Sequence, residues 1–404
     1  MPSLAPARRP LAGYPRQMGE ANPRGFGIYV HVPWCRTRCP YCAFNVYPER
    51  DALWERWADG VVREWGARAP AFVHSPEDRA HSVYFGGGTP SLARPEQLGT
   101  ILAALPRAAD AELTLEANPG GVDRERLAAW RQLGINRLSL GIQTFDERFA
   151  RLLNRGHTVL EARALCELVA DSGLPTWSVD VIFGLPGQSV DDLRQDLSAI
   201  LALAPPHVSL YGLSYEPGTP FGRAHDQGRM RPLDPELWRA QYDLLVETLG
   251  AGGWERYEVS NFARPGHRAR HNEATWRGGH YAGLGPGAHG FEPDGHRTVN
   301  RAEPADWLSD WTATRELPSP LEAAIDLVLS TLRHREGLPL PWLEARTAHR
   351  VDLRALRALL EPPRGAPRLL LLERDTLRLS EQGFPLADGI VARVVDALVH
   401  LAGS

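Results

Sequence analysis

Short apolar runs alternate with longer amphipathic segments between residue 26 and about residue 216. The runs are rich in β-branched and aromatic residues, which is typical of buried strands. Six of them are predicted to be strands: 26–32, 81–87, 112–118, 136–143, 177–184 and 207–216. Strands that alternate with helices in this way form a parallel sheet.

The clearest helix signal lies between the fourth and fifth of these runs. Thr158 and Glu161 have the spacing of a capping box, and Gly173 follows where a left-handed terminating residue is expected. The apolar face of this helix includes Cys166, so this cysteine is predicted to pack in the core.

Two further segments carry helix signals. One runs from Asp123 to Gly134, and the other begins at the N-cap Ser189. The second helix is predicted to bury a stripe formed by Leu193, Leu197, Ile200 and Leu201.

Six βα units in succession predict an α/β fold, a partial (βα)6 TIM-like barrel rather than a flat doubly wound sheet. In such a barrel the functional side chains gather at the C-terminal ends of the strands. The barrel is predicted to span 26–253, after a flexible lead-in at 1–25. A Gly-, His- and aromatic-rich extension at 254–315 is expected to pack on it, and 320–404 should form a small α+β, winged-helix-like domain.

Composition and charge exclude some functions. The chain has 404 residues and a net charge of −4, so it has no basic field that would attract nucleic acid. No apolar run approaches the roughly 20 residues of a membrane span, although peripheral membrane contact stays open. The N-terminus lacks the apolar core of a secretion signal, which predicts a cytoplasmic protein.

Three of the four cysteines, Cys35, Cys39 and Cys42, directly follow the first predicted strand. In a reducing cytosol such thiols are metal ligands or redox groups rather than a disulfide framework. Three thiolates suit an iron–sulfur cluster or zinc. Structural zinc needs a fourth ligand, and the only nearby candidate, His31, lies inside the strand. A cluster held by three cysteines instead leaves one iron open for a cofactor.

Polar residues mark the ends of other strands. The glycine-rich segment 86–91 follows the second strand, and Glu116, Gln143 and Asp180 lie at or near the ends of the next three. Any one of them could be a polar residue that its neighbours satisfy. Their convergence on one barrel face predicts a binding site there.

The spacing of Cys35, Cys39 and Cys42, with Tyr41 before the last of them, resembles the signature of the radical S-adenosylmethionine (SAM) family. The resemblance implies a [4Fe-4S] cluster on the three cysteines and SAM on the open iron, where its reduction gives a 5′-deoxyadenosyl radical. It also implies SAM contacts from Tyr29, Tyr41, Gly87, Gly88, Thr89, Glu116, Gln143, Arg155, Asp180 and Ser214.

Longer segments indicate which group within this family the chain resembles. The stretches "YFGGGTPS", "LSLGIQTF", "VDVIFGLPGQ" and "YAGLGPGAHG" are similar to the group related to oxygen-independent coproporphyrinogen III oxidase. Oxidase-like members carry a further cysteine two residues after the third ligand and a longer N-terminal extension. Phe44 stands at that position here, and the first strand begins close to the N-terminus, as in the HemW subgroup of heme chaperones.

The segment around His271 also helps to distinguish the oxidase-like members from the HemW subgroup. Members of the HemW subgroup have an HNxxYW motif whose histidine is proposed to bind heme. His271, Asn272 and Trp276 fit it, while Thr275 replaces the usual tyrosine. The resemblance therefore implies that His271 binds heme, and His267 is a rival candidate for the same role. The alternative is that this segment is a surface loop that binds no heme.

Together the resemblances imply a heme chaperone that passes heme to an acceptor protein and takes electrons from a donor. The alternative is an enzyme, a coproporphyrinogen III dehydrogenase-like oxidoreductase that oxidatively decarboxylates propionates. A zinc-stabilised binding module would leave the strand-end polar residues without a role. Whether the protein is an enzyme stays open, and no catalytic residue is assigned.

Overall fold

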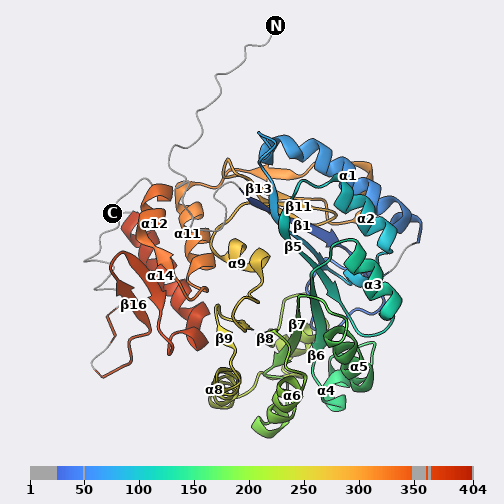
Figure 1. Ribbon diagram of the computed structural model, residues 1–404. Helices are drawn as coiled ribbons and strands as arrows, with labels where there is room; N and C mark the ends of the chain where they lie inside the picture. The colour runs from blue at the N-terminus through green and yellow to red at the C-terminus, as the bar shows by residue number, and fades with distance from the viewer. Residues whose placement is uncertain (1–24, 49–50, 348–360, 363–364, 403–404) are drawn as a thin grey trace.

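The computed structural model describes residues 25–48, 51–347, 361–362 and 365–402, so nearly all of the predicted lead-in lies outside the described residues. Six parallel strands form the centre of the molecule (Figure 1). They are β1 (Phe26–Val32), β4 (Ala80–Gly87), β5 (Arg107–Ala117), β6 (Arg137–Gln143), β7 (Thr176–Phe183) and β8 (His207–Gly212). All six predicted strands are confirmed, although β5 begins earlier and β8 ends four residues sooner than predicted.

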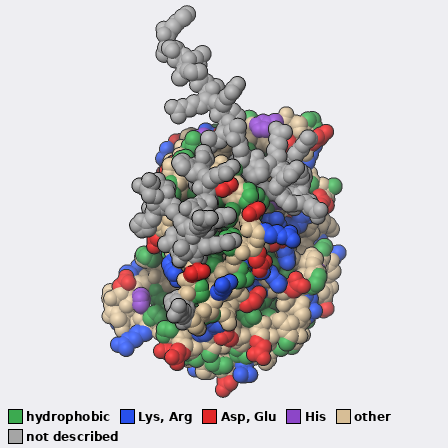
Figure 2. Space-filling view, turned by 90° about the vertical axis from the view of Figure 1, so that its left-hand side faces the viewer, with side chains coloured by type: hydrophobic (Ala, Val, Ile, Leu, Met, Phe, Trp, Pro, Cys, Tyr) green, Lys and Arg blue, Asp and Glu red, His purple; other side chains and the backbone are tan. Residues whose placement is uncertain are grey.

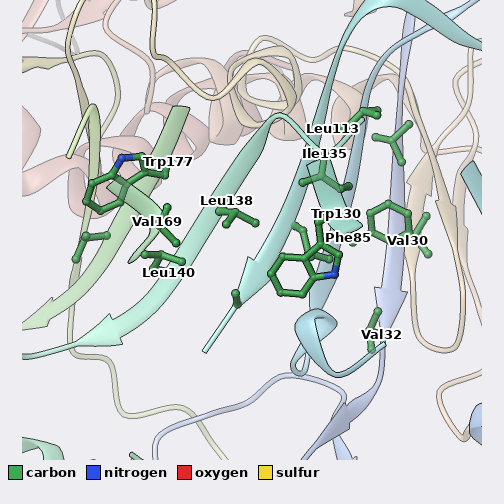
Figure 3. Packing of buried hydrophobic residues seen from close by; sticks show 14 of the residues in the cluster. Val30, Val32, Phe85, Leu113, Trp130, Ile135, Leu138, Leu140, Val169 and Trp177 are labelled. Atoms are coloured by element: carbon green, nitrogen blue, oxygen red, sulfur yellow. The ribbon is translucent and has the colours of Figure 1, made fainter. Parts of the chain in front are cut away.

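Helices line the outside of the curved sheet, as Figure 1 shows. They are α1 (Asp51–Phe72), α2 (Pro95–Ala104), α3 (Arg124–Gln132), α4 (Glu147–Leu152), α5 (Val159–Ala170), α6 (Val190–Leu203) and α8 (Pro235–Ala251). Apolar side chains of helices and strands meet between the two layers. In Figure 3, Trp130 of α3 lies near Phe85 and Leu113 of the strands, and all three are buried.

The helix predictions are confirmed, with one error. Thr158 caps α5 through a capping box, and Cys166 is fully buried. Ser189 caps α6 in the same way. Leu201, however, was wrongly predicted to be buried and is 42% exposed. It lies about 100° around the helix from the buried Ile200, beyond the narrow face that α6 presents to the sheet.

The segment after α8 adds strands to both edges of the sheet. At one edge β10 (Asn261–Ala263) pairs antiparallel with β8 and with β9 (Glu255–Arg256). At the other, β11 (Tyr281–Leu284) lies parallel to β1, followed by β12 (His289–Phe291), β13 (Arg297–Val299) and β14 (Thr314–Glu316). Helix α9 (Arg270–Trp276) connects the two edges and contacts β1 and β4, so it closes the open side of the partial barrel.

A buried carboxylate fastens this extension to α1. Glu64 accepts hydrogen bonds from Gly285 N (2.8 Å), Asn300 Nδ2 (2.7 Å) and Trp307 Nε1 (3.0 Å), and it pairs with Arg68 at 3.0 Å. Burial raises the pKa of Glu64, and these four partners oppose that shift. The carboxylate therefore joins elements that are more than 200 residues apart in the chain.

Replacement of Glu64 by alanine should destabilise the fold by about 3–5 kcal/mol, because Arg68 and three donors would stay buried without their acceptor. Chemical denaturation of the purified protein measures this. Glu55→Ala, on the same helix, is the control, because its ion pair with Arg94 is exposed and should matter little. Equal denaturation midpoints for the two variants would contradict the structural role of Glu64.

The C-terminal part forms a small unit with its own core. It contains α11 (Pro320–Thr331), β15 (Leu338–Pro339), α12 (Leu340–Thr347), β16 (Leu370–Glu373), β17 (Thr376–Leu379) and α14 (Ala387–Ala402). Strands β16 and β17 form a hairpin, and β15 completes an antiparallel sheet. This small domain lies beside α9 in Figure 1.

Among the described residues, no helix has the length and apolar character of a membrane span. Figure 2 views the molecule from the side of the small domain. Acidic and basic side chains are interspersed on this face.

Candidate functional site

The three clustered cysteines lie at the C-terminal edge of the barrel. Cys35 ends the short strand β2 (Trp34–Cys35), which pairs with β3 (Tyr47–Pro48) and so closes the loop between them. Within the loop, Cys42 N donates to Cys39 O at 3.2 Å. All three thiols line one cavity of about 590 Å³. The position is the one predicted for functional groups of a barrel.

The thiols do not form a ready-made site for a single metal ion. Nowhere in the part of the chain that the structure describes do three His, Cys, Asp or Glu side chains come close enough to hold one metal ion. In a cubane cluster each thiolate binds a different iron, so wider spacing is required. His31 cannot complete a zinc site, since its Nδ1 accepts from Tyr29 Oη (3.0 Å) and its Nε2 donates to Asn45 O (2.9 Å).

Burial raises the pKa of Cys35 and of Cys42. Cys35 Sγ also lies 3.4 Å from Thr89 Oγ1, within hydrogen-bonding distance. These thiols would lose their protons on binding iron, because a metal-bound thiol is far more acidic than a free buried thiol. The donor set therefore fits an iron–sulfur cluster.

Arg155 connects the cysteine loop to the strand ends. Its Nη2 donates to Asn118 Oδ1 (2.7 Å) and Gly141 O (2.6 Å), while its Nη1 donates to Cys39 Sγ and Tyr41 Oη, both at 3.3 Å. Its Nε is buried and has no partner in the described chain. A buried N–H without an acceptor costs free energy, and an anionic group of a ligand in the cavity would supply the acceptor.

Two carboxyl groups project from the strands into the same region. Glu116 accepts hydrogen bonds from Tyr84 Oη (2.7 Å) and Gly87 N (3.1 Å), and burial raises its pKa to about 7. Asp180 accepts from Ser139 Oγ at 2.9 Å, and burial raises its pKa as well. Such carboxyl groups are poised to accept hydrogen bonds from a cationic or hydroxyl-bearing ligand.

Eight of the ten predicted SAM contacts line the cavity of the cysteines: Tyr41, Gly87, Thr89, Glu116, Gln143, Arg155, Asp180 and Ser214. Gln143 has a φ of 73°, a left-handed backbone conformation that is uncommon outside glycine and that clusters at functional sites. Tyr29 lines a neighbouring cavity instead, and Gly88 lines neither.

The glycine-rich turn is held by hydrogen bonds of its own. Its backbone amides are already used: Gly88 N donates to Val32 O, Thr89 N to Trp34 O and Gly87 N to Glu116. A Cβ on Gly88 would lie 2.5 Å from Trp34 O, so glycine is required there for the crossing of two backbone segments.

Sequence reasoning missed Asn118 at the end of β5. Its Nδ2 donates to Thr89 Oγ1 at 3.1 Å and its Oδ1 accepts from Arg155, so it joins two predicted contacts. The available signal was its position next to Glu116 at a strand end.

A second cavity of about 650 Å³ occupies the barrel interior between the sheet and α9. It shares Phe44, Gly87, Glu116 and Tyr211 with the first cavity, so the two adjoin. Aromatic side chains dominate its walls, namely Tyr29, Phe44, Tyr84, Tyr211, Trp276 and Tyr281. Phe44 is 66% exposed although it is aromatic, which is consistent with contact to a large apolar ligand.

His271 lies in this second cavity. Its Nδ1 is 2.9 Å from Ser82 Oγ, and its Nε2 has no partner among the described residues. Burial lowers its pKa to about 3, so the ring is neutral. Glu112 fixes its position by accepting from the backbone amides of Arg270 and His271, each at 3.1 Å. His267, the rival, does not line the cavity, and its Nδ1 is 3.0 Å from Thr176 Oγ1.

Comparisons with known proteins identify the family of the chain. Residues 29–200 match the radical SAM superfamily model. The chain is 36% identical to the heme chaperone HemW of Escherichia coli (strain K12) over 70% of this chain and 75% of that protein. It is 35% identical to the mitochondrial radical S-adenosyl methionine domain-containing protein 1 of Bos taurus over 98% of this chain and 93% of that protein.

One solved structure covers almost the whole molecule. Coproporphyrinogen III oxidase (HemN) from Escherichia coli aligns with a TM-score of 0.76 at 21% identity, over 95% of this chain and 91% of that chain. This likeness confirms the α/β barrel fold with its C-terminal addition. Membership of the family implies a [4Fe-4S] cluster and SAM. The chain belongs to the radical SAM superfamily, in the group that contains the heme chaperone HemW.

Proposed function

We propose that this protein is a heme chaperone that binds heme in the second cavity and transfers it to an acceptor protein. One observation carries the proposal: a buried, neutral imidazole, His271, presents an unpartnered nitrogen within an aromatic-lined cavity. Neutral imidazole is the usual protein ligand of heme iron, and aromatic walls suit a flat macrocycle. The HemW of Escherichia coli, to which the chain is similar, is named a heme chaperone.

Cys35, Cys39 and Cys42 would hold the cluster in the first cavity, and the eight residues described above would contact SAM. The cluster and SAM supply one-electron and radical chemistry when bound. Arg155 would pair with the SAM carboxylate, since its buried Nε still lacks an acceptor. Glu116 and Asp180 would accept hydrogen bonds from the donor groups of SAM.

In the second cavity His271 would bind the heme iron through Nε2. Ser82 Oγ accepts the proton of Nδ1 in this arrangement, which leaves the lone pair on Nε2. A ligating histidine usually donates its other N–H in this way, and the partner fixes both tautomer and ring orientation.

Replacement of Ser82 by alanine should weaken heme binding by roughly 10-fold or more, because Nδ1 loses the partner that sets the tautomer. Titration of the apoprotein with hemin measures the affinity, and the potential of the bound heme reports the change in ligand basicity. Ser82→Thr keeps the hydroxyl and should restore most of both. An unchanged affinity and potential in Ser82→Ala would reject this role.

The alternative function is oxidative decarboxylation of coproporphyrinogen III. The adjoining cavities favour it, because a propionate of a bound tetrapyrrole could reach the SAM site past Glu116 and Tyr211. Phe44 argues against it, since the resemblance places a cysteine there in the oxidase-like members. The structural likeness to HemN supports the shared fold only.

Two assays separate these functions. The reconstituted protein should bind hemin stoichiometrically and release it to apomyoglobin, used as a generic heme acceptor. Incubation of the reduced protein with coproporphyrinogen III and SAM should give no catalytic turnover. Accumulation of protoporphyrinogen over many turnovers would overturn the chaperone assignment.

The proposal implies two protein partners, a heme acceptor and an electron donor for the cluster. We place the protein in the cytoplasm, because cluster thiols need a reducing compartment.

A further inference from the structure

We infer that Arg333, in the small C-terminal domain, binds a carboxylate side chain of the tetrapyrrole, so that this domain forms part of the heme site. The inference rests on the proposed function and adds the recognition of the propionates to it. No chemistry was predicted for this domain from its sequence.

Arg333 is positioned by its backbone. It follows α11, and its carbonyl oxygen accepts from Val259 N at 3.0 Å. The next residues are also fixed, because His334 forms a β-bridge with Glu258 and Arg335 N donates to Tyr257 O at 2.9 Å. The turn is therefore attached to the extension that carries α9, and Arg333 lines the second cavity.

The side chain of Arg333 is held while two of its nitrogen donors stay free. Its Nη2 donates to Asp388 Oδ1 at 2.6 Å, and its guanidinium carbon lies 5.9 Å from the centre of the Trp276 ring. Nη1 and Nε have no partner among the described residues. Nη1 and Nε lie on different edges of the guanidinium, so each can donate one charge-assisted hydrogen bond to a carboxylate, and the contacts with Asp388 and Trp276 reduce the cost of ordering the side chain.

Charge in the second cavity points to the same residue. The chain contains no lysine, so all 45 of its basic residues are arginines. Arg333 is the single arginine among the described residues that line this cavity. The other ionisable groups there are histidines, tyrosines, Glu116 and Glu258, and none of these is a fixed cation. A ligand carboxylate in the cavity therefore needs Arg333, because an unpaired buried charge is costly.

Glu258 does not compete strongly for Arg333. It is 1% exposed and accepts from Ser260 N at 3.0 Å, and it makes no hydrogen bond to Arg333. Burial raises its pKa to about 7, so near neutral pH much of it is uncharged. Arg333 thus keeps its positive charge available to the cavity.

Arg333 and His271 lie on the same cavity. Trp276, whose ring lies 5.9 Å from the guanidinium carbon of Arg333, follows His271 by five residues in α9. All three residues line the second cavity, so a tetrapyrrole bound there would be bounded by both the imidazole and the guanidinium.

Binding of two ligands by two forms of the protein tests the inference. Wild type and Arg333→Ala are each titrated with hemin and with hemin dimethyl ester, which has the same ring without free carboxylates. Wild type should prefer hemin by roughly 10-fold or more, and Arg333→Ala should lose most of this preference while binding the ester unchanged. Arg333→Lys, which keeps the charge without the planar fork, should recover part of it. Arg335→Ala, an exposed arginine two residues away, should behave as wild type.

Two results would be decisive against the inference. If Arg333→Ala keeps the full preference for hemin over the ester, Arg333 does not bind the carboxylate, and the proposed function stands without it. If wild type binds neither hemin nor the ester, the proposed function itself fails and the inference with it. Unchanged iron content of the reconstituted variants shows that each has folded.

Discussion

Replacement of Cys35, Cys39 or Cys42 by alanine is expected to abolish the [4Fe-4S] cluster. The three thiols line one cavity, and the only other cysteine, Cys166, is buried in α5. No spare thiol can take the place of a lost ligand. Anaerobic reconstitution with iron and sulfide, followed by absorption and electron paramagnetic resonance spectra of the reduced protein, measures the loss.

Cys166→Ala is the matched control for this experiment. Its side chain packs in the core, so its removal should cost some stability and leave the cluster unchanged. Loss of the cluster in Cys166→Ala, or a normal cluster in one of the other three variants, would show that the ligand set is wrong. Stoichiometric zinc without iron-dependent absorbance in wild type would remove the radical SAM chemistry altogether.

If His271 binds heme as proposed, its replacement by alanine is expected to weaken heme binding. Its Nε2 is the nitrogen left open in the cavity, because Nδ1 is engaged by Ser82. Hemin should then bind at least 10-fold more weakly, with a shifted Soret band, since ligation is lost while the aromatic walls remain. Spectral titration of the apoprotein with hemin gives both quantities.

His267→Ala is the control for a histidine in the same segment. It contacts Thr176 and does not line the cavity, so its removal should leave the Soret band as in wild type. Imidazole added to the His271→Ala protein should restore the wild-type spectrum by filling the vacated position. A His271→Ala spectrum identical to that of wild type would exclude this residue as the ligand.

Much of the barrel could be predicted from local patterns. The six central strands are apolar runs of strand length, and the capping boxes at Thr158 and Ser189 are sequence-local signals. The cysteine loop was also predictable, because its three cysteines lie within eight residues of each other. Leu201 shows the limit: the helical period places it at the margin of the apolar face, and only packing decides whether a marginal residue is buried.

The rest of the sheet could not be predicted in this way. Strands such as β11 and β12 have four and three residues, too few for a periodic pattern, and β11 pairs with β1 across 250 residues of chain. The second cavity depends on these pairings, because they bring α9 over the barrel interior. The resemblance singled out His271, but its burial and its contact with Ser82 follow from that distant pairing.

The sequence by itself determined the fold class, and it placed the three clustered cysteines and most of the polar residues that line their cavity, because these features depend on short-range spacing and on the rule that strand ends meet at one edge. The tertiary structure alone decided that two cavities adjoin, that His271 is buried and neutral while His267 lies elsewhere, and that Arg333 reaches the cavity from the small domain. Each of these depends on contacts between residues far apart in the chain, and such contacts leave no periodic trace in the sequence.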